Sequence, residues 1–188
     1  MFTQETFRIE GTTPLLMHNG QLADPLNEFT KALKLLSSKK KKTDEIHMQM
    51  AQAEWMGGLY ANEAGHPCVP TDNILAMIIA AAKKSRNGVE AKSGVFFMED
   101  SFPLEYAGPK DASALWESGK FRDTRGVRVT TSRIMRTRPI FREWALEFSV
   151  STNPEVIKPG QLGEWIVTGG QMCGIGDYRP RYGLFRVV

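Results

Sequence analysis

The sequence predicts a single α+β domain whose strands form an antiparallel sheet covered by helices. Apolar and polar residues alternate strictly over 144–150, as in a strand with one buried face. Apolar residues recur at helical spacing over 71–84 and 161–170, and both stretches are flanked by stretches with strand character. With 188 residues, the chain is long enough for one domain with a proper core and one sizeable insertion.

The first part of the chain predicts a strand followed by a helical insertion. Residues 7–10 alternate between apolar and charged side chains, which indicates a half-buried strand. From Asp24 the apolar residues take helical spacing, and a second helix is expected to begin after Thr43, a favoured N-cap. We therefore expect a helical hairpin over about 19–57, with the lysine run 39–42 at its exposed tip.

The middle of the chain predicts one buried helix and a loop-rich connection. The helix spans 71–84, where lysines in the last turn suit the negative end of the helix dipole. Residues 93–100 have strand character, and 101–121 form a connection dominated by loops.

The last third predicts two strands, a helix and a final strand. The strands cover 127–134 and 144–150 and are joined through a segment that contains Pro139. A helix over 161–170, ended by a pair of glycines, precedes the final strand over 182–188. Without the insertion, the order is strand, helix, strand, strand, helix, strand. This is the βαββαβ pattern of ferredoxin-like and RRM-like domains, whose open antiparallel sheet often receives single-stranded nucleic acid.

Positive charge is concentrated in the last third of the chain. Residues 1–119 carry 12 basic and 15 acidic side chains, whereas residues 120–188 carry 12 basic and 6 acidic ones. Ten of the twelve arginines lie in the second part. The planar guanidinium group suits phosphates and base edges, so this asymmetry predicts a polyanionic partner, with a merely solvated basic face as the alternative.

The arginines around the two central strands form the first predicted binding surface. Arg128, Arg136 and Arg138 share a parity, so on an unbroken strand they would line one face. Six to eight phosphate contacts would make binding steeply dependent on salt. The predicted track consists of Arg122, Arg125, Arg128, Arg133, Arg136, Arg138 and Arg142.

A glycine-rich stretch after the last helix, GGQMCGIGDYRPRYGLF, forms the second predicted binding surface. Its glycines would let backbone N–H groups approach a phosphate without a Cβ in the way. Its arginines would contact phosphates, and its tyrosines could offer a ring to a base or pack in the core. The predicted residues are Gly174, Gly176, Tyr178, Arg179 and Arg181.

Familiar catalytic and cofactor motifs are missing from the sequence. Arg179 stands where a dinucleotide fingerprint has its third glycine, and there is no Walker loop, HExxH or CxxC motif. The three histidines have no metal-ligand spacing, so neither a metal nor another cofactor is expected. Two distant cysteines, the lack of a signal-peptide pattern and the lack of a long apolar run favour a cytoplasmic protein without membrane contact.

Three stretches together resemble the RAMP superfamily, the RNA-binding proteins that form backbone and guide-processing subunits of CRISPR effector complexes. The glycine-rich loop after the second helix resembles the loop of that superfamily. Residues 11–17, GTTPLLM, resemble its opening segment, and residues 66–83 resemble its entry into the first helix. Thr71, Asp72 and Asn73 stand where the superfamily has Gly-Ser-Ser, so a free-standing relative outside any CRISPR complex is also compatible with the pattern.

The resemblance and the charge pattern lead to one main functional hypothesis and two alternatives. The main hypothesis is a homo-oligomer that binds single-stranded RNA or DNA along its backbone without sequence preference. The first alternative, which the resemblance implies, is a metal-independent endoribonuclease in which His18 or His47 acts as a base. The second is an arginine face that docks an acidic protein.

Overall fold

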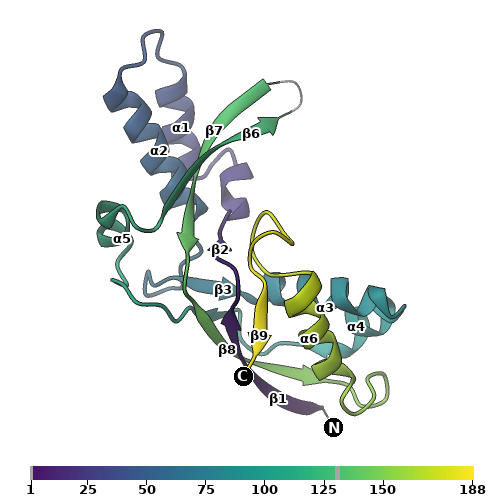
Figure 1. Ribbon diagram of the computed structural model, residues 1–188. Helices are drawn as coiled ribbons and strands as arrows, with labels where there is room; N and C mark the ends of the chain where they lie inside the picture. The colour runs from purple at the N-terminus through teal and green to yellow at the C-terminus, as the bar shows by residue number, and fades with distance from the viewer. Residues whose placement is uncertain (1, 130–131) are drawn as a thin grey trace. The chain divides into compact units, whose positions relative to one another are not determined.

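The computed structural model describes residues 2–129 and 132–188, and its chain forms two compact units (Figure 1). The first unit consists of residues 1–16, 61–107 and 141–188, and the second of 17–60 and 108–140. The second unit is therefore built from two stretches of chain, each of which interrupts the first unit. The predicted helical insertion at about 19–57 lies in the first of these stretches, 17–60.

The first unit contains a four-stranded antiparallel sheet with the strand order β4-β8-β1-β9. Its elements are β1 (Thr3–Gly11), β2 (Leu15–Leu16), β3 (Cys68–Pro70), α3 (Thr71–Lys84), α4 (Gly88–Gly94), β4 (Val95–Phe96), β5 (Ser101–Pro103), β8 (Ala145–Thr152), α6 (Gln161–Met172) and β9 (Phe185–Val187). Strands β3 and β5 pair separately as a second antiparallel sheet.

The central strands β1 and β8 supply the sheet side of the core. Leu146, Phe148 and Val150 of β8 are buried, while Glu147 between them is exposed, so the predicted alternation is confirmed. Leu146 lies opposite Ile9 of β1, and the rings of the opposed pair Phe7 and Phe148 stack at 5.9 Å. Cross-strand pairs of this kind fix the register, because a slip by one residue would turn the apolar face to solvent.

Helices α3 and α6 pack closely against each other because α6 carries glycines at its contacts. A Cβ at Gly169 would overlap the sulfur of Met77 on α3, and one at Gly170 would overlap the carbonyl oxygen of Phe185 on β9. We predicted that this glycine pair ends the helix, but α6 continues to Met172. The glycines serve close packing inside the helix, and this outweighs their low helix propensity.

The predicted strand over 93–100 is largely replaced by other structure. Helix α4 extends to Gly94, and β4 covers only Val95 and Phe96. A Cβ at Gly94 would stand 2.8 Å from the side chain of Ile157, so the end of α4 is packed tightly against the β8–α6 connection. The glycine thus marks a close approach where we had expected the first residues of a strand.

The second unit combines a helical hairpin with a long two-stranded β-hairpin. Its elements are the 3-10 helix η1 (Gly20–Ala23), α1 (Glu28–Ser37), α2 (Asp44–Gly58), α5 (Ala112–Ser118), β6 (Arg122–Val129) and β7 (Ser132–Phe141). The hydroxyl of Thr43 accepts a hydrogen bond from the backbone N–H of Ile46 at 3.4 Å, so the predicted N-cap of α2 is confirmed. The lysines at 39–42 are exposed in the loop between α1 and α2.

The β-hairpin differs from the predicted pair of strands. Strands β6 and β7 pair with each other, and the segment around Pro139 lies within β7 instead of joining two strands. Strand β8 pairs with β1 and β4 in the first unit. The expected strand 127–134 includes residues 130–131, which lie outside the described residues. An α+β fold with antiparallel sheets is confirmed, but the central hairpin is formed by β6 and β7 and not by the two strands that the sequence predicted.

Candidate nucleic-acid interface

The pairing of β6 with β7 places the predicted arginines on two faces of the hairpin. Arg125 lies opposite Arg136, and Arg128 lies opposite Arg133. Directly opposed residues share a face and successive residues alternate. One face therefore carries Arg125, Arg136 and Arg138, and the other carries Arg122, Arg128 and Arg133. The predicted grouping of Arg128 with Arg136 and Arg138 is wrong, because odd-numbered residues of β6 pair with even-numbered residues of β7.

Two arginines of the track have carboxylate partners. Arg125 donates from Nε to Asp123 Oδ2 at 2.6 Å, two residues away on the same strand. Arg136 donates from Nη1 to Glu54 Oε1 at 2.5 Å, across 82 positions of sequence. A carboxylate at this distance neutralises much of the field of the guanidinium group, so both arginines attract a phosphate less strongly than an isolated arginine would.

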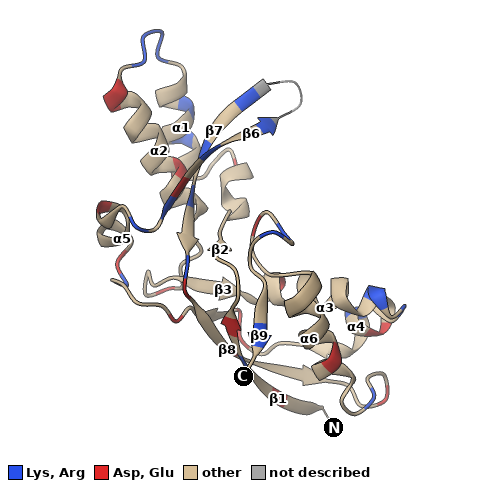
Figure 2. Ribbon diagram, viewed as in Figure 1, with Lys and Arg blue, Asp and Glu red and all other residues tan. Residues whose placement is uncertain are grey.

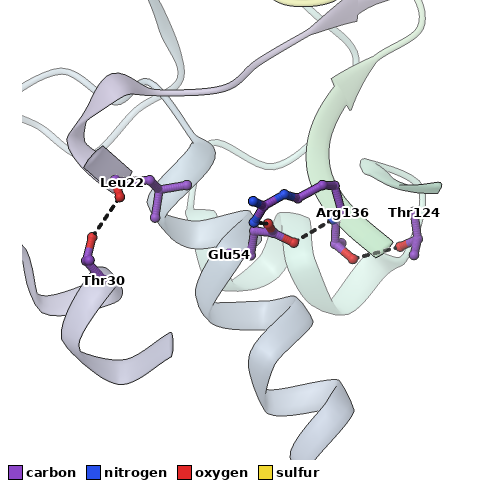
Figure 3. Close-up of polar contacts among 6 residues, drawn as sticks. Leu22, Thr30, Glu54, Thr124 and Arg136 are labelled. Carbon is purple, nitrogen blue, oxygen red and sulfur yellow. Dashed lines mark hydrogen bonds and ion pairs between the residues drawn. The ribbon is translucent and has the colours of Figure 1, made fainter. Parts of the chain in front are cut away.

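Glu54, near the end of α2, is the centre of a buried polar cluster (Figure 3). Its side chain is 8% exposed, and its second oxygen accepts a hydrogen bond from the backbone N–H of Thr137 at 2.8 Å. The hydroxyls of Thr137 and Thr124 lie 3.0 Å apart across the hairpin. Burial of a carboxylate without such partners is strongly unfavourable, so Glu54 keeps these contacts and they fix the end of α2 to β7.

Arg122 and two tryptophans form a second cluster at the start of β6. The guanidinium carbon of Arg122 lies 4.3 Å from the ring centroid of Trp116 on α5, a cation–π contact. Trp55 packs against Trp116 at 5.8 Å, and its indole N–H donates to the carbonyl oxygen of Phe121 at 2.8 Å. Arg122 is half-buried by this arrangement.

The other predicted arginines differ in exposure. Arg128 and Arg133 are exposed near the tip of the β-hairpin, and Arg138 is half-buried on β7. Arg142 is exposed in the turn between β7 and β8, which belongs to the first unit. Figure 2 shows the basic residues at the ends of β6 and β7 and at the tip of the helical hairpin. The arginines of the predicted track thus lie on two faces of the β-hairpin and in both units, and Arg125 and Arg136 among them form ion pairs.

The glycine-rich loop is fixed by its own backbone contacts. Gly174, Gly176 and Gly183 all take positive φ angles between 72° and 78°. The N–H of Gly174 donates to the carbonyl oxygen of Gly169 at 2.8 Å, and the N–H of Ile175 donates to that of Gly183 at 2.9 Å. We expected the N–H of Gly174 to face a ligand, and this expectation is wrong because the loop uses that donor to close its own turn.

Close contact with the segment after β1 explains why position 176 is a glycine. A Cβ at Gly176 would stand 2.5 Å from the carbonyl oxygen of Leu16, and the next N–H, that of Asp177, donates to this oxygen at 2.7 Å. The N–H of Gly183 donates to Pro14 at 2.8 Å. Asp177 and Gly183 thus both contact the segment 11–16, so the glycine-rich loop lies beside most of the stretch GTTPLLM in the first unit.

The glycine-rich loop and helix α3 together line an open groove of about 540 Å³. It is lined by residues that include Ala76, Ala80 and Lys84 of α3 and Asp177, Tyr178 and Arg179 of the loop. Lys84 and Arg179 are exposed, and Tyr178 is 48% exposed, so core packing does not account for this tyrosine. Two of the predicted binding residues, Tyr178 and Arg179, thus lie in an accessible groove.

The pKa of the Cys173 thiol depends on the charged residues of this groove. Burial raises the pKa of its thiol, while the nearby charges of Lys84 and Arg179 act in the opposite direction. Both cations therefore act on one point of the groove. The carboxylate of Asp177 also lines the groove and offsets part of their charge, so the two cations together outnumber the one acid there.

The sequence prediction missed a second basic cluster beside the first. A neighbouring groove of about 570 Å³ is lined by Lys83 of α3, by Arg86 and by Lys92 of α4. All three side chains are exposed, and Arg86 takes a positive φ of 64° in the turn between the helices. The stretch KKSRNGVEAK was the available signal, but a lysine pair at a helix end is also ordinary dipole complementation.

The histidines occupy different surroundings. His47 is exposed on α2, within the second unit. The carbonyl oxygen of His18 accepts a hydrogen bond from Tyr60 at 3.1 Å. Among residues 2–129 and 132–188, no group of three or more His, Cys, Asp or Glu side chains is arranged to hold a metal ion. Within the same residues, no helix has the length and apolar character needed to cross a bilayer.

Comparison with known proteins finds similar chains by structure alone. No protein-family model matches the chain, and no curated protein matches it in sequence. A chain of the cryo-electron microscopy structure of Type III-B Cmr-beta bound to cognate target RNA superposes with a TM-score of 0.53 at 11% identity. It aligns with all of the present chain, which spans 59% of that chain. Cmr6 from Pyrococcus furiosus aligns over 100% of this chain and 99% of its own, with a TM-score of 0.42 at 7% identity.

The likeness to the chain of the Cmr-beta structure concerns the fold alone, and it agrees with the α+β, RAMP-like fold that the sequence predicted. The two similar chains share few residues with this chain, so the chemistry of its surface has to be judged from its own side chains.

Proposed function

We propose that this chain binds RNA, with the groove between the glycine-rich loop and α3 as the principal contact. The observation that carries the proposal is the convergence of Lys84 and Arg179 on one open groove that also contains the half-exposed ring of Tyr178. Two cations and a ring match the phosphate and the base of one nucleotide. The fold shared with a chain of an RNA-bound assembly supports the same conclusion.

The finer features of the proposal follow from the type of contact. Lysine and arginine in an open groove contact phosphates, which carry no sequence information, so binding is independent of sequence. A ring such as that of Tyr178 can stack on a base only where the strand is unpaired, which favours a single strand. The order β1, α3, β4, β8, α6, β9 with the sheet order β4-β8-β1-β9 supports a ferredoxin-like first unit. In the proposed assembly, several copies lie along one strand, as in a CRISPR effector backbone.

Fluorescence anisotropy with labelled oligo(U) and oligo(dT) tests the proposal over a range of salt concentrations. The double variant Lys84→Ala/Arg179→Ala is expected to weaken binding and to lower the slope of log K against log salt by about 1.4, since each phosphate contact on a single strand contributes about 0.7. Lys31→Ala/Lys158→Ala is the matched control, because both lysines are exposed and lie outside this groove.

The outcomes separate the possible partners. Equal affinity of the double variant and the control would rule out the groove as the principal contact. Nucleic acid that copurifies with the protein and dissociates in high salt would argue against an acidic protein partner. Stronger binding of oligo(U) than of oligo(dT) would identify RNA, and native mass spectrometry on oligo(U) of increasing length would count the copies on one strand.

Cleavage of RNA is a second candidate function with one observation in its favour. His47 lines a groove of the second unit that also contains Glu54 and Arg136, so a base and a cation are available near one another. Labelled RNA incubated with the protein in EDTA should then be cut, and His47→Ala should abolish the cut while His18→Ala leaves it. Intact RNA after incubation with the wild-type protein would exclude this function.

A further inference from the structure

The second unit contains a groove of about 560 Å³ between its helical hairpin and its β-hairpin. Leu33 of α1, Met50 of α2, and Ile134 and Met135 of β7 form apolar walls. Met135 is 63% exposed although it is a large apolar residue. Pockets of this size with mostly apolar walls and a few polar groups are typical of sites for flat organic ligands, and methionine adapts well to aromatic rings.

Arg136 is the polar side chain that distinguishes this groove. Glu54 holds its guanidinium group at 2.5 Å, and the side chain keeps 37% of its surface exposed (Figure 3). The carboxylate neutralises much of the charge, but Arg136 still lines the groove with more than a third of its side chain exposed. A guanidinium plane whose orientation is fixed is a good stacking surface for a nucleobase.

The groove also has a positive charge among its lining residues. Lys42 lines it and belongs to the exposed run of four lysines at the tip of the helical hairpin. His47 is exposed at the same groove. An apolar peptide would gain nothing from this charge, whereas a nucleotide places its ring between the walls and its phosphate at the lysines.

We propose that this groove binds one unstacked nucleobase of the bound strand, with Arg136 against the ring and Lys42 at the phosphate. This inference rests on the proposed RNA binding and adds a base site to it. It also assigns Arg136 a role other than the phosphate contact that its place in the arginine track predicted. Stacking on an arginine plane tolerates any base, so the site fits binding without sequence preference.

The test compares oligo(U) with an abasic ribose-phosphate oligomer of the same length. Arg136→Lys keeps a positive charge beside Glu54 and so protects the fold, but it removes the planar group. We expect it to weaken binding of oligo(U) by at least about fivefold, the lower end for loss of one stacked base, with no change for the abasic oligomer or in the salt slope. Met135→Ala should act in the same direction, because Met135 forms a wall of the groove.

Met48→Ala is the matched control, since Met48 lies on the same helix as Met50, is 55% exposed and does not line this groove. Unchanged oligo(U) affinity of both Arg136→Lys and Met135→Ala would overturn the base site, even if the wild-type protein binds RNA, and would leave the groove to a different ligand or to a protein partner. An equal loss of affinity on oligo(U) and the abasic oligomer would identify Arg136 as a phosphate contact and would also overturn it. A wild-type protein that binds neither oligomer would contradict the proposed function itself.

Discussion

The glycine-rich loop and the β6–β7 hairpin both carry arginines, but they use them differently. In the loop, backbone hydrogen bonds fix the turn, and the cations around it, Lys84 and Arg179, are exposed in a groove. In the hairpin, Asp123 and Glu54 hold two of the arginines as ion pairs. The number of arginines in a segment is therefore a poor measure of the charge that it offers to a partner. The carboxylates within about 4 Å of each guanidinium group have to be counted as well.

The backbone of the loop gives the largest expected effect. Gly183 has a φ of 72°, and a Cβ there would overlap the carbonyl oxygen of Ile175. Gly183→Ala should lower the free energy of unfolding by about 3 kcal/mol or more, which urea denaturation measures. The control is Gly163→Ala in α6, where a Cβ meets open space and should stabilise the protein by about 0.5–1 kcal/mol. Similar destabilisation by both changes would show that loop geometry is not the cause.

The ion pair at Glu54 gives the next largest effect. Glu54→Gln removes the charge beside Arg136 but keeps an acceptor for the N–H of Thr137, so we expect a loss of about 2–3 kcal/mol in the free energy of unfolding. Asp123→Asn breaks the more local pair with Arg125 and should cost about 1 kcal/mol or less. If denaturation gave the two variants equal stability, the idea that Glu54 of α2 stabilises the β-hairpin more than Asp123 does would be refuted.

Salt dependence compares the two regions directly. Arg179→Ala should reduce RNA affinity about fivefold near 0.1 M salt, equivalent to about 1 kcal/mol, and lower the salt slope by about 0.7. Arg125→Ala should leave the slope unchanged, because Asp123 already neutralises Arg125. Anisotropy titrations at several salt concentrations measure both. The reverse ranking would mean that the hairpin, and not the loop, contacts the phosphates.

An exposed ion pair of the first unit gives the smallest effect. Arg8 donates two hydrogen bonds to Glu105, at 2.8 and 2.7 Å, and these hold the pKa of the Glu105 carboxyl below its usual value. The ion pair therefore stabilises the folded protein at pH values above the pKa that Glu105 has in the unfolded chain. This contribution is lost as the pH falls through the lowered pKa of Glu105 in the folded protein. Glu105→Gln should flatten the acid side of the stability curve slightly, as thermal melts between pH 3 and 7 can detect. A steeper acid side in the variant would contradict this sign.

Local sequence patterns were sufficient to predict much of the fold. The alternation over 144–150 predicted β8, helical spacing predicted α3 and α6, and Thr43 marked the start of α2. Each of these signals depends on neighbours within a few positions of the chain. The α+β class followed from their order.

The parts that the sequence did not predict depend on pairing between distant residues. The pairing of β6 with β7 brings arginines of opposite parity onto one face, and no residue pattern revealed this register. Glu54 and Arg136 are 82 positions apart, so nothing local indicated that one would hold the other. Gly169 appeared to end a helix, because its contact with Met77 of another helix is invisible in the sequence.

The last turn of α2 has a mechanical consequence for the β-hairpin. Two successive residues, Glu54 and Trp55, hold the backbone of Thr137 on β7 and of Phe121 just before β6. One helical turn is thus a common anchor for both strands near their base, and Arg128 and Arg133 lie farther along the hairpin. A small rotation of that turn would displace these two arginines more than the anchored residues, so a residue change at the anchor could redirect them without touching them.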